Sequence, residues 1–416
     1  MKYLIATIYA IIVCFVILIE GVRIPDATIK GGYRFASTFI KKMVKPQVGP
    51  NDIATHERFR FTVIENESGL GNKGIEKLVE EDVEVSEEKT KPFQHVFEAF
   101  DTQCAISIFG VTDDNVSAFL CKDMERVVKA YDKVFSKTNE ESEIYEINHR
   151  TSNSVMVSDE TATIFSLAKD FYRWSNNKFD ISAGTLINLW DVKNRKTLPT
   201  AEEINEAKSH CGNFDYEIEW DVDDSSERKN RITFKGDLKT QYDFGGLIKG
   251  YCCDALQNMV SSSEVISACI VNLGGNVMCK GKVEGRKDGS FHVGIIKPFS
   301  ETNEIIETVD VNDKNVITSG NYQRYFKIPG DDRVYHHIID PQSGEPSNNG
   351  LDSVTIVSNN GLLGDYLSTA CMLLGEEESK KLIDFAAESF EDKNIQAIFV
   401  RSNGKISKYP KNVTIK

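Results

Sequence analysis

Paired cysteines are missing from this chain. It contains nine cysteines, but no two of them are spaced as a CxxC motif, and the count is odd. The missing pairs argue against the common zinc sites, and the odd count with the adjacent Cys252 and Cys253 argues against a disulfide framework. We therefore expect most of the cysteines to be small, buried hydrophobic residues.

An excess of positive charge is missing as well. The 416 residues include 49 Lys and Arg against 63 Asp and Glu, which gives a formal net charge of −14. A surface this acidic repels phosphate backbones, so we expect no nucleic-acid partner and instead a small molecule or another protein. The hydrophobic content of 40% and charged content of 27% are those of a globular protein.

One segment near the start has no charge at all. The run from Tyr3 to Ile19 would form a helix of roughly 26 Å, just enough to cross a bilayer core. No small-residue cleavage site follows it, and Cys14 lies inside the run, so a lipoprotein signal is not expected. We expect residues 1–22 to be an uncleaved membrane anchor, with a cleaved signal peptide as the alternative. Positive charges on both sides leave its orientation open.

The region after this segment lacks a strong hydrophobic period. Residues 75–92 are acidic, contain no glycine and have few large apolar side chains. We expect residues 23–92 to form a partly disordered stalk or linker, with a partner-binding segment as the alternative. The folded domain is then expected over residues 93–416.

The rest of the chain favours a single large α+β domain with mixed or antiparallel sheets and flanking helices. Alternating residues at 104–109 predict a strand, and short strands recur from about residue 215. A final hairpin is predicted on Asn403–Gly404. Helices are predicted over residues 115–135, from Ser158, from the capping box of Thr200 and Glu203, over 364–375 and over 376–390.

Three stretches contain residues that could form a binding or catalytic site. In each of them the same residues could also have a purely structural role. In "YDFGGLIKGYCCD" (242–254), a strand ends at Asp243 and a helix begins with Lys249. The glycines between them allow a phosphate to approach backbone N–H groups, although a plain turn fits equally. This junction contains neither GxxxxGK[ST] nor GxGxxG. Asp365 and Thr369 are four residues apart, so their side chains share a helix face and could bind Mg²⁺ together. Alternatively, Asp365 caps the helix and the Thr369 hydroxyl bonds to its own helix backbone.

The third stretch is "RVYHHIID" (333–340), in which alternation predicts a strand. Neighbouring residues of a strand point to opposite faces, so His336 and His337 are not expected to grip one ion together. At most one of them faces a site, and both can be half-exposed strand residues.

Taken in order, these stretches and several others resemble the FAD:protein FMN transferase (ApbE-like) family. The resemblance covers roughly residues 95–410. The matching motifs are "SEIYEIN" (142–148), "FDISAGTLINLW" (179–190), "YDFGGLIKGYCCD" (242–254), "VNLGGN" (271–276), "TSGNYQRYF" (318–326), "HHIIDPQSGEP" (336–346), "SVTIV" (353–357) and "GDYLSTACMLLG" (364–375).

The resemblance implies roles for individual residues. His337 matches a family histidine that points into the flavin nucleotide site, and the implied catalytic set is His337, Asp243 and Asp365. The residues implied to surround FAD are Phe100, Thr138, Phe179, Asp180, Ile181, Asp243, Lys249 and Ile339. The residues implied to hold a metal ion are Asp365 and Thr369 through their side chains, Gly246 through its backbone carbonyl, and Ser368 where some members carry a second acid.

The resemblance also implies an activity, with Mg²⁺ as cofactor and FAD as substrate. A hydroxyl of a Thr or Ser on a target protein attacks the FAD pyrophosphate, FMN becomes attached through a phosphoester bond, and AMP leaves. The implied target is a flavin-accepting electron-transfer protein at a membrane, so the domain is expected to lie outside the cytoplasm on its N-terminal anchor. The alternatives are an FAD pyrophosphatase that releases FMN and AMP, and an FAD-binding protein without catalysis.

Overall fold

The computed structural model describes residues 91–223, 227–286 and 288–411. The expected membrane anchor and nearly all of the expected stalk lie outside these residues. No helix in the described ranges is long and apolar enough to span a membrane.

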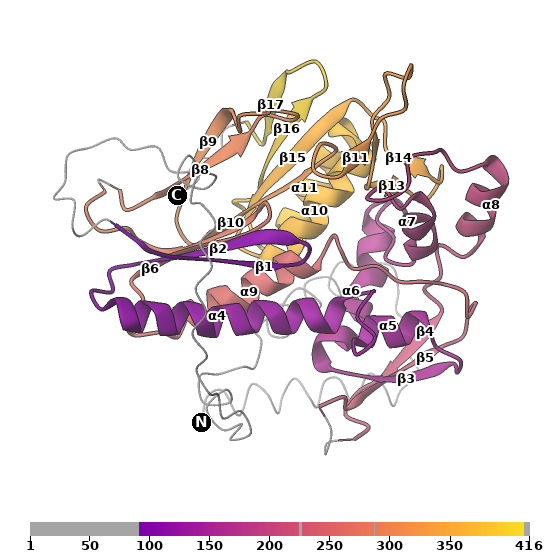
Figure 1. Cartoon of the computed structure of the whole chain (residues 1–416), viewed down its shortest axis with the longest axis horizontal. Helices are drawn as coiled ribbons and strands as arrows, with labels where there is room; N and C mark the ends of the chain where they lie inside the picture. The colour runs from indigo at the N-terminus through magenta and orange to yellow at the C-terminus, as the bar shows by residue number, and fades with distance from the viewer. Residues whose placement is uncertain (1–90, 224–226, 287, 412–416) are drawn as a thin grey trace.

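An eight-stranded sheet forms the centre of the fold (Figure 1). Every neighbouring pair in it is antiparallel, which confirms the expected α+β class with an antiparallel sheet. In spatial order its strands are β1 (Phe93–Ala99), β2 (Thr102–Phe109), β6 (Ala268–Leu273), β7 (Asn276–Gly281), β10 (Lys314–Gly320), β15 (Leu351–Ser358), β16 (Gln396–Arg401) and β17 (Ile406–Tyr409).

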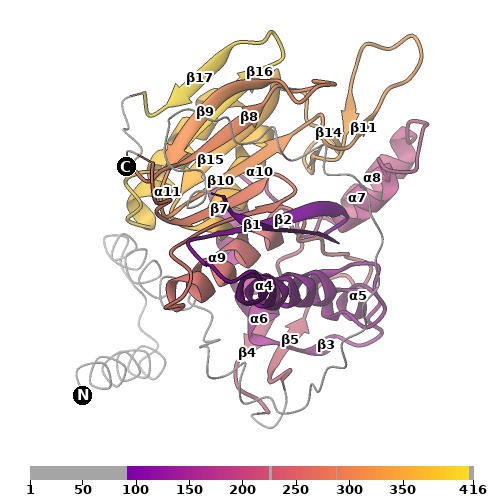
Figure 2. The same cartoon turned by 60° about the vertical axis from the view of Figure 1, so that its left-hand side comes forward.

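Shorter strands form smaller sheets around this centre. The three-stranded sheet lies at the opposite end of the molecule from β16 and β17 in both views (Figures 1 and 2). Its strands, in order, are β3 (Ser154–Val157), β5 (Asn230–Phe234) and β4 (Tyr216–Glu219). The two-stranded pairs are β8 (Phe291–Ile296) with β9 (Ile305–Val311), β11 (Tyr325–Phe326) with β12 (Tyr335–His336), and β13 (Ile339–Asp340) with β14 (Glu345–Pro346).

Helices cover one face of the central sheet and the β8–β9 hairpin covers the other. Long helix α4 runs along β1 and β2 in Figure 1, and its buried side chains pack with those of α9 against β2, β6 and β7. The hairpin buries Phe291, Val293 and Val309 against Val316 and Ile398 of the sheet. The helices are α4 (Asp114–Phe135), α5 (Glu143–Asn148), α6 (Asp159–Trp174), α7 (Gly184–Trp190), α8 (Ala201–Ser209), α9 (Ile248–Ser261), α10 (Gly361–Leu374) and α11 (Glu376–Ser389).

Most of the predicted elements are confirmed, and local signals explain why. Asp113 and Ser158 cap α4 and α6 through their side chains, and Thr200 and Glu203 form the expected capping box of α8. The hairpin on Asn403–Gly404 is present between β16 and β17. All described cysteines are free, and only Cys211 among them is not buried.

The predicted strand through the two histidines is wrong as one continuous element. Strand β12 ends at His336, and the chain leaves strand geometry at His337 before β13 begins at Ile339. Each half pairs with a different partner, since His336 pairs with Tyr325 and Ile339 pairs with Pro346. Alternation along the sequence could not reveal this change of partner, which depends on distant segments.

Helices α9 and α10 cross at backbone contact distance. A Cβ atom built on Gly250 would lie 2.1 Å from the Gly361 carbonyl oxygen, and one built on Gly361 would lie 2.3 Å from the Gly250 carbonyl oxygen. No real Cβ tolerates such distances, so both positions require glycine. The crossing therefore brings the N-terminal turns of two helices together.

Replacing Gly361 with alanine is expected to lower the free energy of unfolding by about 3 kcal/mol or more, because the new methyl group must push two helix backbones apart. Urea denaturation followed by circular dichroism measures the change. Gly364→Ala is the matched control on α10, because its new Cβ meets only the end of the Ile317 side chain at 3.0 Å. Equal losses in the two variants would contradict the proposed backbone contact.

Candidate active site

The glycine-rich junction that precedes α9 is held by its neighbours. The Asn148 side chain donates to the Tyr242 carbonyl at 2.8 Å and accepts from the Tyr242 N–H at 2.7 Å. The Asp243 N–H donates to the Ile181 carbonyl at 2.8 Å, and Asp243 Oδ1 accepts from the Gly245 N–H at 2.8 Å. These bonds fix the orientation of the junction relative to the helix that follows.

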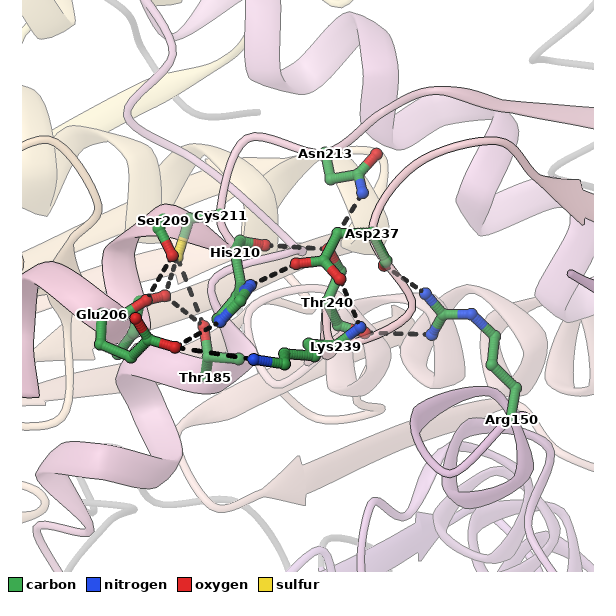
Figure 3. Close-up of polar contacts among 11 residues, drawn as sticks. Arg150, Thr185, Glu206, Ser209, His210, Cys211, Asn213, Asp237, Lys239 and Thr240 are labelled. Atoms are coloured by element: carbon green, nitrogen blue, oxygen red, sulfur yellow. Dashed lines mark hydrogen bonds and ion pairs between the residues drawn. The ribbon is translucent and has the colours of Figure 1, made fainter. Parts of the chain in front are cut away.

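A polar network anchors the segment just before this junction (Figure 3). The buried Arg150 guanidinium donates to the carbonyl oxygens of Asp237 at 2.9 Å and Thr240 at 3.0 Å. His210, after α8, contacts the carboxylates of Asp237 and Glu206 through its two ring nitrogens. Arg150, which follows α5, and His210, which follows α8, thus both hold the loop at residues 237–240. This restrains the chain that leads to Asp243.

Asp243 faces two cationic side chains. Lys137 Nζ lies 2.9 Å from Asp243 Oδ2 and donates to Asn188 Oδ1 at 3.0 Å. Burial alone would raise the pKa of Asp243, but the charge and hydrogen bond of Lys137, the Gly245 N–H and the charge of Arg324 together lower it below its ordinary value. Asp243 is therefore ionised at neutral pH.

Asp365 of α10 caps the other helix, α9. Its side chain is buried, and Oδ2 accepts from the Gly250 N–H at 2.8 Å. Gly250 is in the first turn of α9, whose N-cap residue Leu247 provides no side-chain cap. Burial raises the pKa of Asp365, against the opposing effects of the Lys249 charge, the nearby Asn276 amide and the Gly250 N–H.

Asp254 of α9 caps α10 in return. Its Oδ1 accepts from the Gly361 N–H at 2.6 Å, and its Oδ2 accepts from the Leu362 N–H at 2.8 Å. Burial, with a further contribution from the charge of Asp365, raises the pKa of Asp254 to about 7, although the two N–H bonds oppose this. Each helix thus supplies an aspartate side chain to the N-terminus of the other.

The oxygen groups expected to hold a metal ion lie on these adjacent elements. A Cβ built on Gly246 would lie 3.1 Å from Thr369 Oγ1, so the junction passes directly beside Thr369. Asp365 is one helical turn before Thr369. Ser368 is fully buried, donates to the Asp365 carbonyl at 3.0 Å and lies 2.7 Å from Ser319 Oγ, so its hydroxyl is already engaged.

This donor set contains one carboxylate, one hydroxyl and one backbone carbonyl. In the part of the chain that the structure describes, no group of three or more His, Cys, Asp or Glu side chains is arranged to hold a metal. The set does not suit zinc, but hard oxygen donors with positions left for phosphate or water suit Mg²⁺. Buried Asn276 lies close enough to Asp365 to lower the pKa of that carboxyl, yet its amide makes no hydrogen bond of 3.5 Å or less with the described residues.

The two histidines have different surroundings. His336 is 2% exposed and its Nε2 lies 2.7 Å from the Ser347 carbonyl oxygen, so it is part of the interior. His337 Nδ1 lies 3.3 Å from the Arg324 carbonyl oxygen. The pKa of His337 is lowered to about 3, first by burial and then by nearby positive charge from His336, Arg324 and Lys249. His337 is therefore neutral at neutral pH and lies among the cations of the site.

Three residues expected to surround FAD lie along one segment. Phe179 is buried and packs edge-on against Tyr366, and a Cβ built on Gly246 would lie 3.0 Å from its ring. Ile181 is buried and contributes its carbonyl to Asp243. Asp180 uses both oxygens internally, since one accepts from Ser182 and the other from the Gly212 N–H.

The other expected FAD residues are spread more widely. The Lys249 side chain is half-buried, and its ammonium makes no hydrogen bond or ion pair with the described residues. Phe100 lies at the β1–β2 turn with a φ of 53°, and its carbonyl accepts from Arg324 at 3.3 Å. Thr138 is exposed and bonds to Ser136 at 3.2 Å. Ile339 is buried in a separate cluster with Leu186 and Trp190.

Sequence reasoning missed Lys137, Arg324 and Ser319 as site residues. Arg324 and Ser319 lie within the motif "TSGNYQRYF", but only the fold brings Arg324 to Phe100 and His337 and brings Ser319 to Thr369, 3.2 Å away. Lys137 precedes the expected Thr138, and nothing in the local sequence connects it with Asp243.

Comparison with known proteins gives consistent results. The ApbE family model matches residues 100–399. An FAD:protein FMN transferase of Klebsiella pneumoniae is 28% identical, over 68% of this chain and 82% of its own length, and one of Treponema pallidum is 26% identical, over 71% and 84%. The crystal structure of an ApbE protein from Thermotoga maritima superimposes with a TM-score of 0.65 at 27% identity, covering 77% of this chain and 97% of that one.

The raised pKa of Asp254 predicts a pH-dependent stability. Between about pH 4 and pH 7 the folded protein keeps a proton on Asp254 that the unfolded chain releases, so the free energy of unfolding falls as pH rises through this range. Asp254→Asn is expected to reduce that fall by roughly 2 kcal/mol or more. Urea denaturation at pH 4.5, 6 and 7.5 measures the slope.

Asparagine at position 254 also loses one acceptor for the two α10 N–H groups, which lowers the free energy of unfolding at every pH. The test therefore compares how this free energy changes with pH and not its absolute value. Asp123→Asn on α4 is the control, because this half-buried carboxylate pairs with Arg126 away from the crossing, and it is expected to keep the wild-type slope. A wild-type slope in Asp254→Asn would show that Asp254 is ionised throughout this range.

Proposed function

This chain belongs to the ApbE family, and we propose that it is an FAD:protein FMN transferase. In this proposal a Thr or Ser hydroxyl of a target protein attacks the phosphorus on the FMN side of the FAD diphosphate. The bond between that phosphorus and the bridging oxygen breaks, AMP leaves with that oxygen, and FMN stays attached through a phosphoester bond. The observation that carries the proposal is the meeting of Gly246, Thr369 and Asp365 at the crossing of α9 and α10.

The charges around this crossing suit a diphosphate. The chain has a net charge of −14, yet Lys137, Lys249 and Arg324 all act on the acidic or histidine side chains of the site. Lys249 is half-buried without a partner in the described residues, so its ammonium is available to an anion. The first turn of α9 adds the partial positive charge of a helix N-terminus.

Mg²⁺ fits the same place. Asp365, Thr369 and the Gly246 carbonyl would hold it, with Ser368 close behind them, and it would neutralise charge on the diphosphate when bound. The Asp365 carboxylate already has one oxygen fixed by Gly250, so this side chain cannot leave the crossing. The Gly250 N–H is the only described group within 3.5 Å that donates a hydrogen bond to this side chain, so the carboxylate can still act as a ligand.

His337 and Asp243 are the groups that can handle the proton of the attacking hydroxyl. His337 is neutral, and a proton on Nδ1 directed at the Arg324 carbonyl leaves Nε2 as an acceptor. The hydroxyl can donate to Nε2, and the negative charge of a bound diphosphate would raise the low pKa of His337, so that the proton can move to the ring as the phosphoester bond forms. Asp243 is ionised and held by Lys137, which suits it to orient the flavin nucleotide or the hydroxyl.

We also propose that the described domain belongs to a catalytic unit spanning residues 93–416, attached by residues 1–22 to a membrane through the stalk at 23–92. The uncharged run from Tyr3 to Ile19 supports this arrangement. The acceptor would then be an electron-transfer protein of the same membrane, with the transferase domain outside the cytoplasm. Accessibility of the domain to protease in intact cells tests the orientation.

Mass spectrometry of a threonine-containing acceptor after incubation with enzyme, FAD and Mg²⁺ tests the activity. The acceptor is expected to gain the mass of an FMN phosphoester, with AMP released in equal amount. Asp365→Ala is expected to reduce the rate by about a thousandfold or more, because it removes the only carboxylate of the ion site. Asp123→Ala, on the α4 surface, is the control and should keep full activity.

The other outcomes identify the rival functions. Free FMN and AMP without any gain of mass in the acceptor would mean that the protein is a pyrophosphatase. FAD that stays bound and intact in the presence of Mg²⁺ would mean that it only carries the flavin.

A further inference from the structure

Asn276 combines complete burial with unused hydrogen-bonding capacity. It is the first residue of β7, its side chain is 0% exposed, and neither its Nδ2 nor its Oδ1 has a hydrogen-bond partner in the described residues. A buried amide in this state has lost its water without gaining a partner, which lowers stability. Such a residue needs an explanation outside folding.

The position of Asn276 beside the candidate ion site supplies this explanation. It pairs with Ile317 of β10, whose side chain lies 3.0 Å from the position of a Cβ on Gly364, the residue before Asp365. On the other side, Cys253 of α9 points its thiol at the Asn276 carbonyl, 4.0 Å away. Asn276 is therefore enclosed by the sheet and by both crossing helices. The Asn276 amide and the Asp365 carboxyl therefore lie close to each other, although no hydrogen bond of 3.5 Å or less joins them.

We infer that Asn276 is a positioning residue for Asp365. The crossing holds only one oxygen of that carboxylate, Oδ2, through the Gly250 N–H. The amide of Asn276 would hold the other oxygen in the direction of Gly246 and Thr369 once a divalent cation and a diphosphate occupy the site. This inference rests on the proposed function, since it assigns Asn276 to the same ion site.

Two substitutions separate this role from a structural one. Asn276→Leu removes the unpaired groups at similar volume, so in EDTA it is expected to unfold at the same or a higher urea concentration than the wild type. The Mg²⁺ concentration that gives half of the thermal stabilisation in the presence of FAD is expected to rise about tenfold, as for other residues that orient metal ligands. Stability and ion affinity thus change independently.

Asn276→Asp provides a test with the opposite signature. A second carboxylate beside Asp365 is expected to lower the melting temperature in EDTA through like-charge repulsion, and Mg²⁺ is expected to raise it by more than it raises that of the wild type. This variant keeps the inference testable if Asn276→Leu does not fold.

Asn315 of β10 is the matched control. It is equally buried, and its Nδ2 bonds to Gln257 Oε1 at 3.1 Å. Asn315→Leu is expected to lose stability in EDTA while keeping the wild-type requirement for Mg²⁺.

The measurements distinguish two kinds of failure. If Mg²⁺ does not stabilise the wild type with FAD, the ion site of the proposed function is wrong. If Mg²⁺ stabilises the wild type and Asn276→Leu at the same concentrations, or if Asn276→Leu behaves like Asn315→Leu, Asn276 is structural and the inference is overturned.

Discussion

The structure depends on the exchange of carboxylates between α9 and α10. Asp365 accepts from the first turn of α9, and Asp254 accepts from the first two N–H groups of α10. Gly250 and Gly361 make the exchange possible, because any side chain there would separate the helices. A carboxylate at a helix N-terminus contributes about 1 kcal/mol in ordinary cases. Here the interaction also places the Asp365 carboxyl group beside the glycine-rich junction that precedes α9.

This arrangement explains how an acidic protein can present a site for an anion. Asp243 and Asp365 are each engaged by N–H groups and influenced by lysine or arginine charges, so their negative charge is partly compensated within the site. Lys249 remains without a partner in the described residues. The neutral state of His337 follows from the same burial and the same cations, because both disfavour a further positive charge. The charges of the site therefore depend on one another.

The sequence predicted those parts of the fold and site that depend on neighbouring residues. The caps of α6 and α8 and the shared face of Asp365 and Thr369 follow from the spacing of residues along the chain. The break between His336 and His337 did not follow, because the two short strands have different partners. The ion pair of Lys137 with Asp243 joins residues that only the fold brings together.

The candidate site also combines features that local sequence can reveal with features that depend on contacts between distant segments. Motifs indicated that Asp243, Gly246 and Asp365 have related roles, but not that Asp365 caps α9 or that the Ser368 hydroxyl is already bonded to Ser319. Such facts depend on contacts between α10, α9 and the sheet, and no local pattern encodes them.

The placement of β2 beside β6 has a consequence for biogenesis. Phe109 pairs with Ala268, and residues 110–267, including α4 to α9, lie between them along the chain. A nascent polypeptide must therefore complete these helices before β2 gains its second neighbour, which gives the topology a high contact order and slows folding. Until then the unpaired edge of β2 remains open to intermolecular strand pairing. The delay therefore prolongs the stage of folding at which the chain is most prone to aggregate.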